Sequence, residues 1–180
     1  RIDCAQCHDH PLAREIKQAH YWGLVAAFNR SKNVRDEGVS ESAIGGYVNF
    51  TNLKKESQPA LVTLLNGKTL PETWPSRDTK EEDAEDKYLD PKAKVRVPKF
   101  SRREAFADAT THDNPLLARA FVNRMWAVFM GRGLVHPADE MNARNAPSHP
   151  ELLDWLARDF ANSGYDVKRL ARGLVLTPVY

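Results

Sequence analysis

A segment of mixed charge near the middle of the chain, from Arg77 to Arg96, divides the sequence into two parts. Acidic and basic residues dominate it, and its few apolar residues cannot form a buried element, which is typical of a solvated linker. We therefore predict a charged linker over 77–98. An N-terminal part over 1–76 precedes it, and a C-terminal domain over 99–180 follows it.

The C-terminal part carries strong signals for the starts and ends of helices. Ser101 and Glu104 have the spacing of a capping box, in which two side chains satisfy backbone N–H groups at a helix start. Asn114 stands before Pro115 as an N-cap residue before the first helical position, and Gly131 supplies a stop. This pattern predicts one short helix followed by a longer one.

Two further helices are predicted toward the end of the chain. Ser148 and Glu151 repeat the capping-box spacing, Gly164 ends the helix that they start, and Asp166 caps one more. The residues expected on the buried face of the first of these helices are Leu152, Leu153, Leu156 and Phe160.

The N-terminal part shows a helical pattern that gives way to irregular structure. A helix is predicted from Pro11 to about Asn29, because one stripe of residues recurs at every fourth position. The residues of this stripe, expected to face a core, are Leu12, Ile16, His20, Leu24 and Phe28. Farther along, the run 60–65 and the pair Asn66-Gly67 favour a β-hairpin. The fold class predicted is mainly α, with a less regular, hairpin-containing middle segment and the charged linker.

Charge and hydropathy exclude several classes of function. The net charge is +2, from 26 basic and 24 acidic residues that are mixed along the chain without a basic stripe. We therefore predict no nucleic-acid partner. No run approaches the roughly 20 apolar residues that cross a bilayer, so no membrane span is expected in this sequence. The first residue is Arg1, and Tyr180 follows a helical pattern, so we expect the sequence to be an internal fragment of a longer protein.

The segment Cys4-Ala5-Gln6-Cys7-His8 is the motif that carries chemistry. Covalent attachment of haem needs two thiols about one helical turn apart, which add to the two vinyl groups of the porphyrin, and an adjacent imidazole that binds the iron. Cys4 and Cys7 would form the thioethers, and His8 would be the proximal ligand. The predicted cofactor is haem c.

Two other interpretations of the cysteines stay open. In the first, Cys4 and Cys7 are a small structural pair or a local disulfide, and the neighbouring histidines are polar surface residues. In the second, the cysteines bind a metal together with His8 and His10, although structural zinc sites usually draw their ligands from two separated segments. A thioredoxin-like role is disfavoured because no βαβ pattern surrounds the motif.

A low-spin haem iron also needs a second axial ligand. His20 is the leading candidate because it interrupts the apolar stripe just after the motif, although a lone histidine in such a stripe is more often a core residue. The other candidates, each with a default role in packing or at the surface, are Met125, Met130, Met141, His136 and His149.

The C-terminal part offers no enzyme mechanism of its own. Arg124 and Asp139 are candidates for a buried ion pair, or for a carbohydrate or ion site, while Trp126 and Trp155 are expected in the core. No serine, histidine and aspartate series, glycine-rich phosphate loop or acid pair in a convincing helical context is present, so we predict neither a hydrolase nor a transferase.

Two stretches resemble a known pair of domains. Residues 4–11, with Tyr21-Trp22-Gly23-Leu24, resemble the C-terminal end of the cytochrome-c-like domain (DUF1549) of large planctomycete proteins. The stretches 114–126, 131–139 and 147–156 resemble the N-terminal part of the partner domain that follows it there (DUF1553). His20 stands where that family has an acidic residue, and Asp139-Glu140 where it has paired aspartates. The resemblance implies an exported protein with a haem or redox role.

The function expected from the sequence is electron transfer through c-type haem in the bacterial cell envelope. The partners would be a redox protein or other domains of the same protein, and the location periplasmic or at the cell surface, because haem is attached on the oxidising side of the membrane. The alternative is a non-redox structural or polysaccharide-related binding module whose Cys/His cluster is structural or holds a metal.

Overall fold

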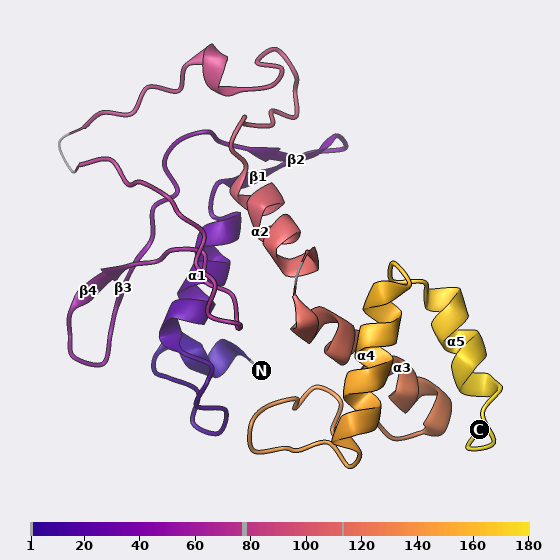
Figure 1. Ribbon diagram of the computed structural model, residues 1–180. Coiled ribbons are helices and arrows are strands. Elements are labelled where there is room, and N and C mark those ends of the chain that lie inside the picture. The colour runs from indigo at the N-terminus through magenta and orange to yellow at the C-terminus, as the bar shows by residue number, and fades with distance from the viewer. Residues whose placement is uncertain (1, 77–78, 113) are drawn as a thin grey trace. The chain divides into compact units, whose positions relative to one another are not determined.

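The computed structural model describes residues 2–76, 79–112 and 114–180, which form two compact units. The N-terminal unit spans Ile2–Thr110, and the C-terminal unit spans Thr111–Tyr180. Figure 1 shows the elements of each unit.

The N-terminal unit combines short helices with two small hairpins. Its elements are η1 (Ile2–Gln6), α1 (Gln18–Phe28), β1 (Ser31–Val34), β2 (Gly38–Glu41), β3 (Asn49–Thr51), β4 (Ser57–Pro59), η2 (Glu85–Lys87) and α2 (Arg102–Thr111). Strand β1 pairs with β2, and β3 with β4, both antiparallel. The β1–β2 and β3–β4 hairpins were not predicted from the sequence, because their strands are three or four residues long and rich in polar side chains.

Small residues on α1 let another segment pack closely against it. A Cβ atom on Gly23 would lie 2.6 Å from the Leu61 carbonyl oxygen, so this position accepts glycine alone without movement of the backbone. Ala26 and Ala27 are fully buried, in a cluster with Ala60 and Val62. The core of this unit therefore forms where the segment 60–64 crosses α1.

The predicted apolar stripe on the first helix is wrong at both of its ends. Helix α1 begins at Gln18 rather than after Pro11, and Leu12 is 61% exposed. Phe28, at the other end, is 47% exposed. The core of this unit is built on the alanines of α1, which the fourfold spacing of larger side chains does not reveal.

The hairpin predicted around Asn66-Gly67 is present in reduced form. The chain reverses there, with Gly67 in the left-handed region at φ 85°, and the Leu64 N–H donates to the Lys68 carbonyl oxygen at 2.8 Å. A single bridge joins Thr63 to Thr69, so the arms are too short to be strands.

The described part of the charged segment 77–98 folds onto the N-terminal unit. Tyr88 within it is 2% exposed, and its hydroxyl donates to Asp83 at 2.5 Å while accepting from the Ala43 N–H at 3.0 Å. Along the chain, the boundary between the two units falls between Thr110 and Thr111, beyond this segment. One buried aromatic ring thus anchors a stretch whose average composition is typical of a linker. Arg77 and Asp78, at its start, lie outside the described residues.

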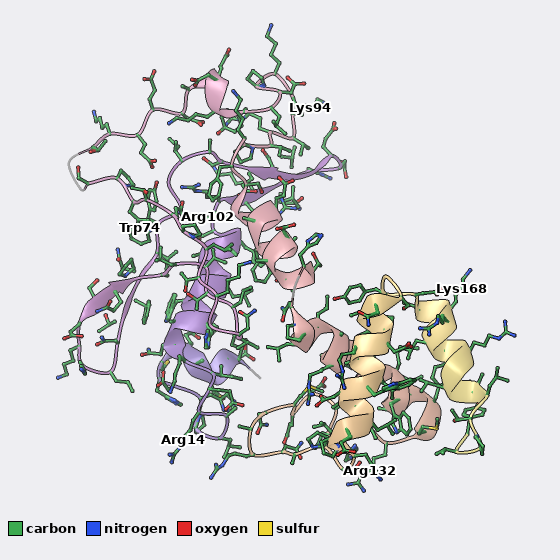
Figure 2. The ribbon with its side chains drawn as sticks, viewed as in Figure 1. Arg14, Trp74, Lys94, Arg102, Arg132 and Lys168 are labelled. Carbon is green, nitrogen blue, oxygen red and sulfur yellow. The ribbon has the colours of Figure 1, made fainter. Side chains whose placement is uncertain are left out.

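A buried charged cluster lies at the start of α2 (Figure 2). The Arg102 guanidinium, on a residue 2% exposed, donates to the Glu72 carboxylate through Nε at 2.9 and 3.0 Å and through Nη2 at 2.8 Å. Arg30 also pairs with Glu72, at 3.1 Å. The Ser101 side chain accepts from the Glu104 N–H, as the capping-box spacing predicts, and donates to Glu41.

The C-terminal unit is a small helical assembly of α3 (Pro115–Met130), α4 (Pro150–Asn162) and α5 (Val167–Val175). Its core is formed by the buried faces of these helices, together with Leu134 and Val135 from the long α3–α4 loop. Two predicted caps are confirmed: Asn114 accepts from the Leu116 N–H at 3.2 Å, and Asp166 accepts from the Arg169 N–H at 2.9 Å. Gly131 ends α3 in the left-handed region, also as predicted.

Two expectations for this unit need correction. Helix α4 begins at Pro150 with His149 as its N-cap residue, so Ser148 does not cap it. The Ser148 N–H instead donates to the Leu134 carbonyl oxygen at 2.7 Å. Trp126 packs against the core as expected, but Trp155 is 58% exposed because it lies on the face of α4 opposite Leu153.

The fold is mixed rather than clearly mainly α, and it does not conflict with the predicted class. Across the described residues five α-helices accompany two two-stranded sheets, with the helices concentrated toward the C-terminus. None of the described helices combines the length and the apolarity that crossing a membrane requires.

Candidate functional site

The Cys-x-x-Cys-His segment lies at the surface of the N-terminal unit. Cys4 belongs to η1 and Cys7 follows directly after it, and both are free and exposed. Ala5, between them, is fully buried. One side of this short helix therefore faces the protein, while the two thiols remain accessible to a large planar group.

The imidazole of His8 is oriented by its neighbour. Its Nδ1 atom lies 2.6 Å from the carbonyl oxygen of Asp9, a distance at which an Nδ1–H group donates a hydrogen bond. In that tautomer the proton occupies Nδ1 and the lone pair of Nε2 is free. This arrangement is typical of histidines that bind a metal through Nε2.

Helix α1 holds the backbone of the motif in place. The carbonyl oxygen of Gln6 accepts hydrogen bonds from the Trp22 indole at 3.0 Å and from the Gln18 side-chain amide at 3.4 Å. The Asp9 carboxylate accepts from the Gln18 backbone N–H at 3.1 Å and pairs with the Lys17 ammonium group. The segment that carries the two thiols is therefore anchored on both sides of Cys7.

These anchoring residues were not identified from the sequence. Trp22 and Gln18 contact the motif across turns whose geometry no local pattern encodes. Asp9 offered a weak signal, because an acidic residue ahead of a helix favours the positive end of the helix dipole.

The two remaining histidines of this region accept hydrogen bonds from backbone N–H groups. His10 accepts through Nδ1 from the Leu12 and Ala13 N–H groups, at 3.2 and 2.9 Å. His20, which is 8% exposed, accepts through Nδ1 from the Lys17 N–H at 2.9 Å. A neutral ring that accepts at Nδ1 carries its proton on Nε2 and has no free lone pair for a metal. We therefore assign His20 to the start of α1 and not to a second axial position.

The position of His20 makes the stability of the N-terminal unit depend on pH. Burial lowers the pKa of His20 below its ordinary value of 6.5, against an opposing effect of the Asp9 charge. The unfolded chain therefore binds this proton more readily than the folded chain, so the stabilisation is present above about pH 6.5 and is lost as the pH falls. We expect the free energy of unfolding to decrease less between about pH 7.5 and pH 5.5 in His20→Gln than in the wild type, as measured by urea titration. An equal decrease would contradict this assignment.

Among the described residues, the motif is not joined by a cluster of further metal-binding side chains. Within 2–76, 79–112 and 114–180, no group of three or more His, Cys, Asp or Glu side chains is arranged to hold a metal ion. The other candidate axial ligands all belong to the C-terminal unit. Met125, Met130 and Met141 pack against its core, while His136 and His149 line an open cavity of about 530 Å³.

The ion pair predicted between Arg124 and Asp139 forms, but at the surface. The side chain of Arg124 is 62% exposed and that of Asp139 is 78% exposed. Water therefore screens the pair, and it contributes little to stability. The expectation of a buried pair is wrong because α3 turns this face toward solvent.

Comparison with known proteins finds a similarity in the C-terminal part of the chain. Residues 102–180 match the model of the PSD1 family, described as a protein of unknown function (DUF1553). No curated protein and no solved structure matches the chain. The match starts at Arg102, three residues after the start predicted for this domain, and so supports the predicted similarity of the C-terminal part to DUF1553.

Proposed function

We propose that Cys4, Cys7 and His8 hold a covalently attached haem c, and that the protein acts in electron transfer in the cell envelope. One observation carries the proposal: two free, exposed thiols flank a backbone anchored to α1, next to an imidazole whose Nδ1 is engaged and whose Nε2 is free. The resemblance of residues 4–28 to the end of a cytochrome-c-like domain is consistent with it.

The residues of this chain fit the group chemically. Each thiol would add across a vinyl group, forming one carbon–sulfur bond while the thiol hydrogen passes to the other vinyl carbon. This addition needs no oxidant and releases no leaving group. The hydrogen bond from His8 to the Asp9 carbonyl would fix the ring and raise the basicity of Nε2.

When bound, haem supplies a one-electron couple whose potential depends on the axial ligands and on burial. The contribution of the chain is to position the proximal ligand. Trp22 and Gln18 hold the Gln6 carbonyl, and Asp9 connects the end of the motif to the start of α1. These contacts would keep His8 in one orientation through repeated cycles of oxidation and reduction.

The partners and the location follow from the same proposal. Haem c is attached on the oxidising side of the bacterial inner membrane, so the protein would work in the periplasm or at the cell surface. Its electrons would pass to or from a redox partner protein, or other domains of the same protein.

A pyridine haemochrome spectrum tests the proposal. The chain is produced in cells with a haem-attachment system and extracted with acid–acetone, which removes haem that is not bound covalently. We expect the wild type to keep a c-type spectrum and the double variant Cys4→Ala/Cys7→Ala to lose it. His10→Ala, two residues beyond the motif, is the matched control and should keep the spectrum.

A blank wild-type spectrum would overturn the proposal. Metal analysis of the same sample would then separate the two remaining forms of the alternative module. Bound zinc or iron would indicate a metal-binding Cys/His cluster, and its absence a structural one, in either case within a non-redox or polysaccharide-related binding module.

A further inference from the structure

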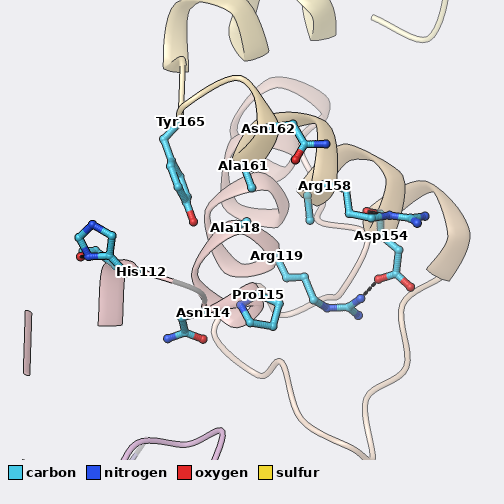
Figure 3. Close-up of a pocket in the computed structure, with 12 residues that line it drawn as sticks. His112, Asn114, Pro115, Ala118, Arg119, Asp154, Arg158, Ala161, Asn162 and Tyr165 are labelled. Atoms are coloured by element: carbon cyan, nitrogen blue, oxygen red, sulfur yellow. Dashed lines mark hydrogen bonds and ion pairs between the residues drawn. The ribbon is translucent and has the colours of Figure 1, made fainter. Parts of the chain in front are cut away.

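A groove crosses the surface of the C-terminal unit between α3 and α4 (Figure 3). Its volume is about 860 Å³, within the range of sites that hold small organic ligands. Three alanines form its floor: Ala118 from α3, with Ala157 and Ala161 from α4. Because their methyl groups offer no hydrogen bonds, this part of the groove favours an apolar ligand surface.

The two ends of the groove differ in chemistry. Figure 3 shows the Tyr165 ring at one end and the side chains of Arg119, Asp154 and Arg158 at the other. Arg119 forms an ion pair with Asp154, which offsets the charge of that carboxylate. Arg158 donates through Nε to the Asp154 backbone oxygen at 3.2 Å, and its terminal amino groups have no partner among the described residues. This end therefore has one guanidinium in excess.

Tyr165 occupies a backbone conformation that disfavours a large side chain. Its φ is 60°, directly after Gly164 at φ 70°, where L-residues other than glycine and asparagine are strained. The ring packs edge-on against Phe160, with ring centres 5.2 Å apart. The contact with Phe160 accounts for the position of the aromatic ring. The hydroxyl group of Tyr165 reaches the groove and has no hydrogen-bond partner in the described part of the chain.

From this arrangement we infer that the α3–α4 groove binds an organic carboxylate with a flat apolar body. The body lies over the alanine floor against the Tyr165 ring, and the carboxylate accepts hydrogen bonds from Arg158. The amide of Asn162, one turn beyond Arg158 on the same side of α4, is a further donor at the rim. This binding site is independent of the haem proposal, because every residue that lines it belongs to the C-terminal unit.

The test is a titration of the ¹⁵N-labelled 180-residue chain with sodium indole-3-acetate, followed by NMR. Indole-3-acetamide, which is neutral and nearly the same shape, is the matched ligand. We expect the acetate to shift the backbone amides of Ala118, Ala161 and Asn162 in a saturable manner, and the acetamide to bind at least fivefold more weakly.

Variants locate the determinants of binding. Arg158→Gln should weaken binding of the acetate about five- to tenfold, the loss expected for one solvent-screened, charge-assisted hydrogen bond. Ala161→Leu should weaken it by filling the floor. Arg172→Gln, the same exchange on α5 outside the groove, should bind within about twofold of the wild type.

Three results would each overturn the inference. They are no saturable shift, equal binding of acetate and acetamide, and wild-type affinity in Arg158→Gln. Circular dichroism and thermal melts of each variant establish that a loss of binding does not come from unfolding. A failed haemochrome test leaves these outcomes unaffected, because the titration needs no haem.

Discussion

Replacing Arg102 by methionine is expected to lower the free energy of unfolding of the N-terminal unit by about 3–5 kcal/mol. The side chain lies at the first residue of α2 and is 2% exposed, so its charge depends wholly on protein partners. The guanidinium donates to Glu72 and also, through Nη1, to the backbone oxygens of Gly46 at 2.7 Å and Ala26 at 3.2 Å. Methionine has a similar length but no donor, so the Gly46 and Ala26 oxygens would lose their hydrogen bonds to Arg102, and Glu72 would keep Arg30 as its one charged partner among the described residues.

The loss would extend beyond a single ion pair because Arg102 belongs to a connected cluster. Arg30 pairs with the same Glu72 carboxylate and lies 5.4 Å from the centre of the Tyr47 ring. The Tyr47 hydroxyl donates to Glu81 at 2.8 Å. Without Arg102, Glu72 would keep one cation instead of two in a site where water screens charge poorly.

Urea unfolding of the wild type and two variants measures this effect. Arg102→Lys should recover less than half of the loss, since one ammonium group cannot reach the Glu72 carboxylate and both carbonyl oxygens together. Arg103→Met is the matched control: its side chain donates one long hydrogen bond, to Val39 at 3.3 Å, and its loss should cost about 0.5 kcal/mol or less. A cost for Arg102→Met as small as that of the control would show that the cluster contributes nothing to stability.

The start of α2 shows what local sequence can and cannot predict. Ser101 and Glu104 identified the helix start correctly, because a cap is formed between residues three apart. The carboxylate of Glu41 completes this cap, accepting from the Arg102 N–H at 2.7 Å and from the Ser101 hydroxyl at 2.5 Å. Glu41 lies sixty residues earlier on the edge of a hairpin, and no spacing rule connects it to α2.

The two units differ in how far their structure depends on residues that are close together in the sequence. In the C-terminal unit the helix signals are local, and Asn114, Gly131 and Asp166 act as predicted. In the N-terminal unit the core depends on a crossing of α1 by the segment 60–64, which only a glycine and two alanines permit. Small residues carry almost no periodic hydrophobic signal, so the stripe of larger side chains gave the wrong buried face.

The candidate haem site was predictable to the extent that it is local in sequence. Cys4, Cys7 and His8 form a contiguous motif, and the structure leaves both thiols exposed. The contacts that anchor the motif come from Gln18 and Trp22 on α1, which follow Gln6 in the sequence by 12 and 16 residues. The interpretation of His20 depended on which ring nitrogen is engaged, and only the three-dimensional arrangement shows this.

The family match and the compact units have different boundaries, and this bears on how the C-terminal part should be produced. The match begins at Arg102, whereas the C-terminal unit begins at Thr111. The helix between these positions packs with the N-terminal unit through Arg102 and Ala109, both buried. A fragment cut at the family boundary would therefore expose a helix whose core partners had been removed.

Replacing Asn123 by leucine is expected to lower the free energy of unfolding of the C-terminal unit by about 2–4 kcal/mol. Asn123 is fully buried in α3, and its amide exchanges two hydrogen bonds with the backbone of Val135. The Val135 N–H donates to Oδ1 at 2.8 Å, and Nδ2 donates to the Val135 carbonyl oxygen at 3.0 Å. Leucine would leave both of these buried backbone groups unpaired.

Thermal and urea unfolding measure the loss, with Asn162→Leu as the matched control at an exposed position of α4, where we expect a change of about 0.5 kcal/mol or less. The variant Asn123→Asp gives a sharper test. Its ionised carboxylate still accepts a hydrogen bond from the Val135 N–H, but it has no proton to donate to the Val135 carbonyl oxygen. Protonation restores that donor, so the deficit of Asn123→Asp relative to the wild type should shrink as the pH falls from about 7 to 4. A deficit that stays constant with pH would mean that the loop is held by packing rather than by this pair of hydrogen bonds.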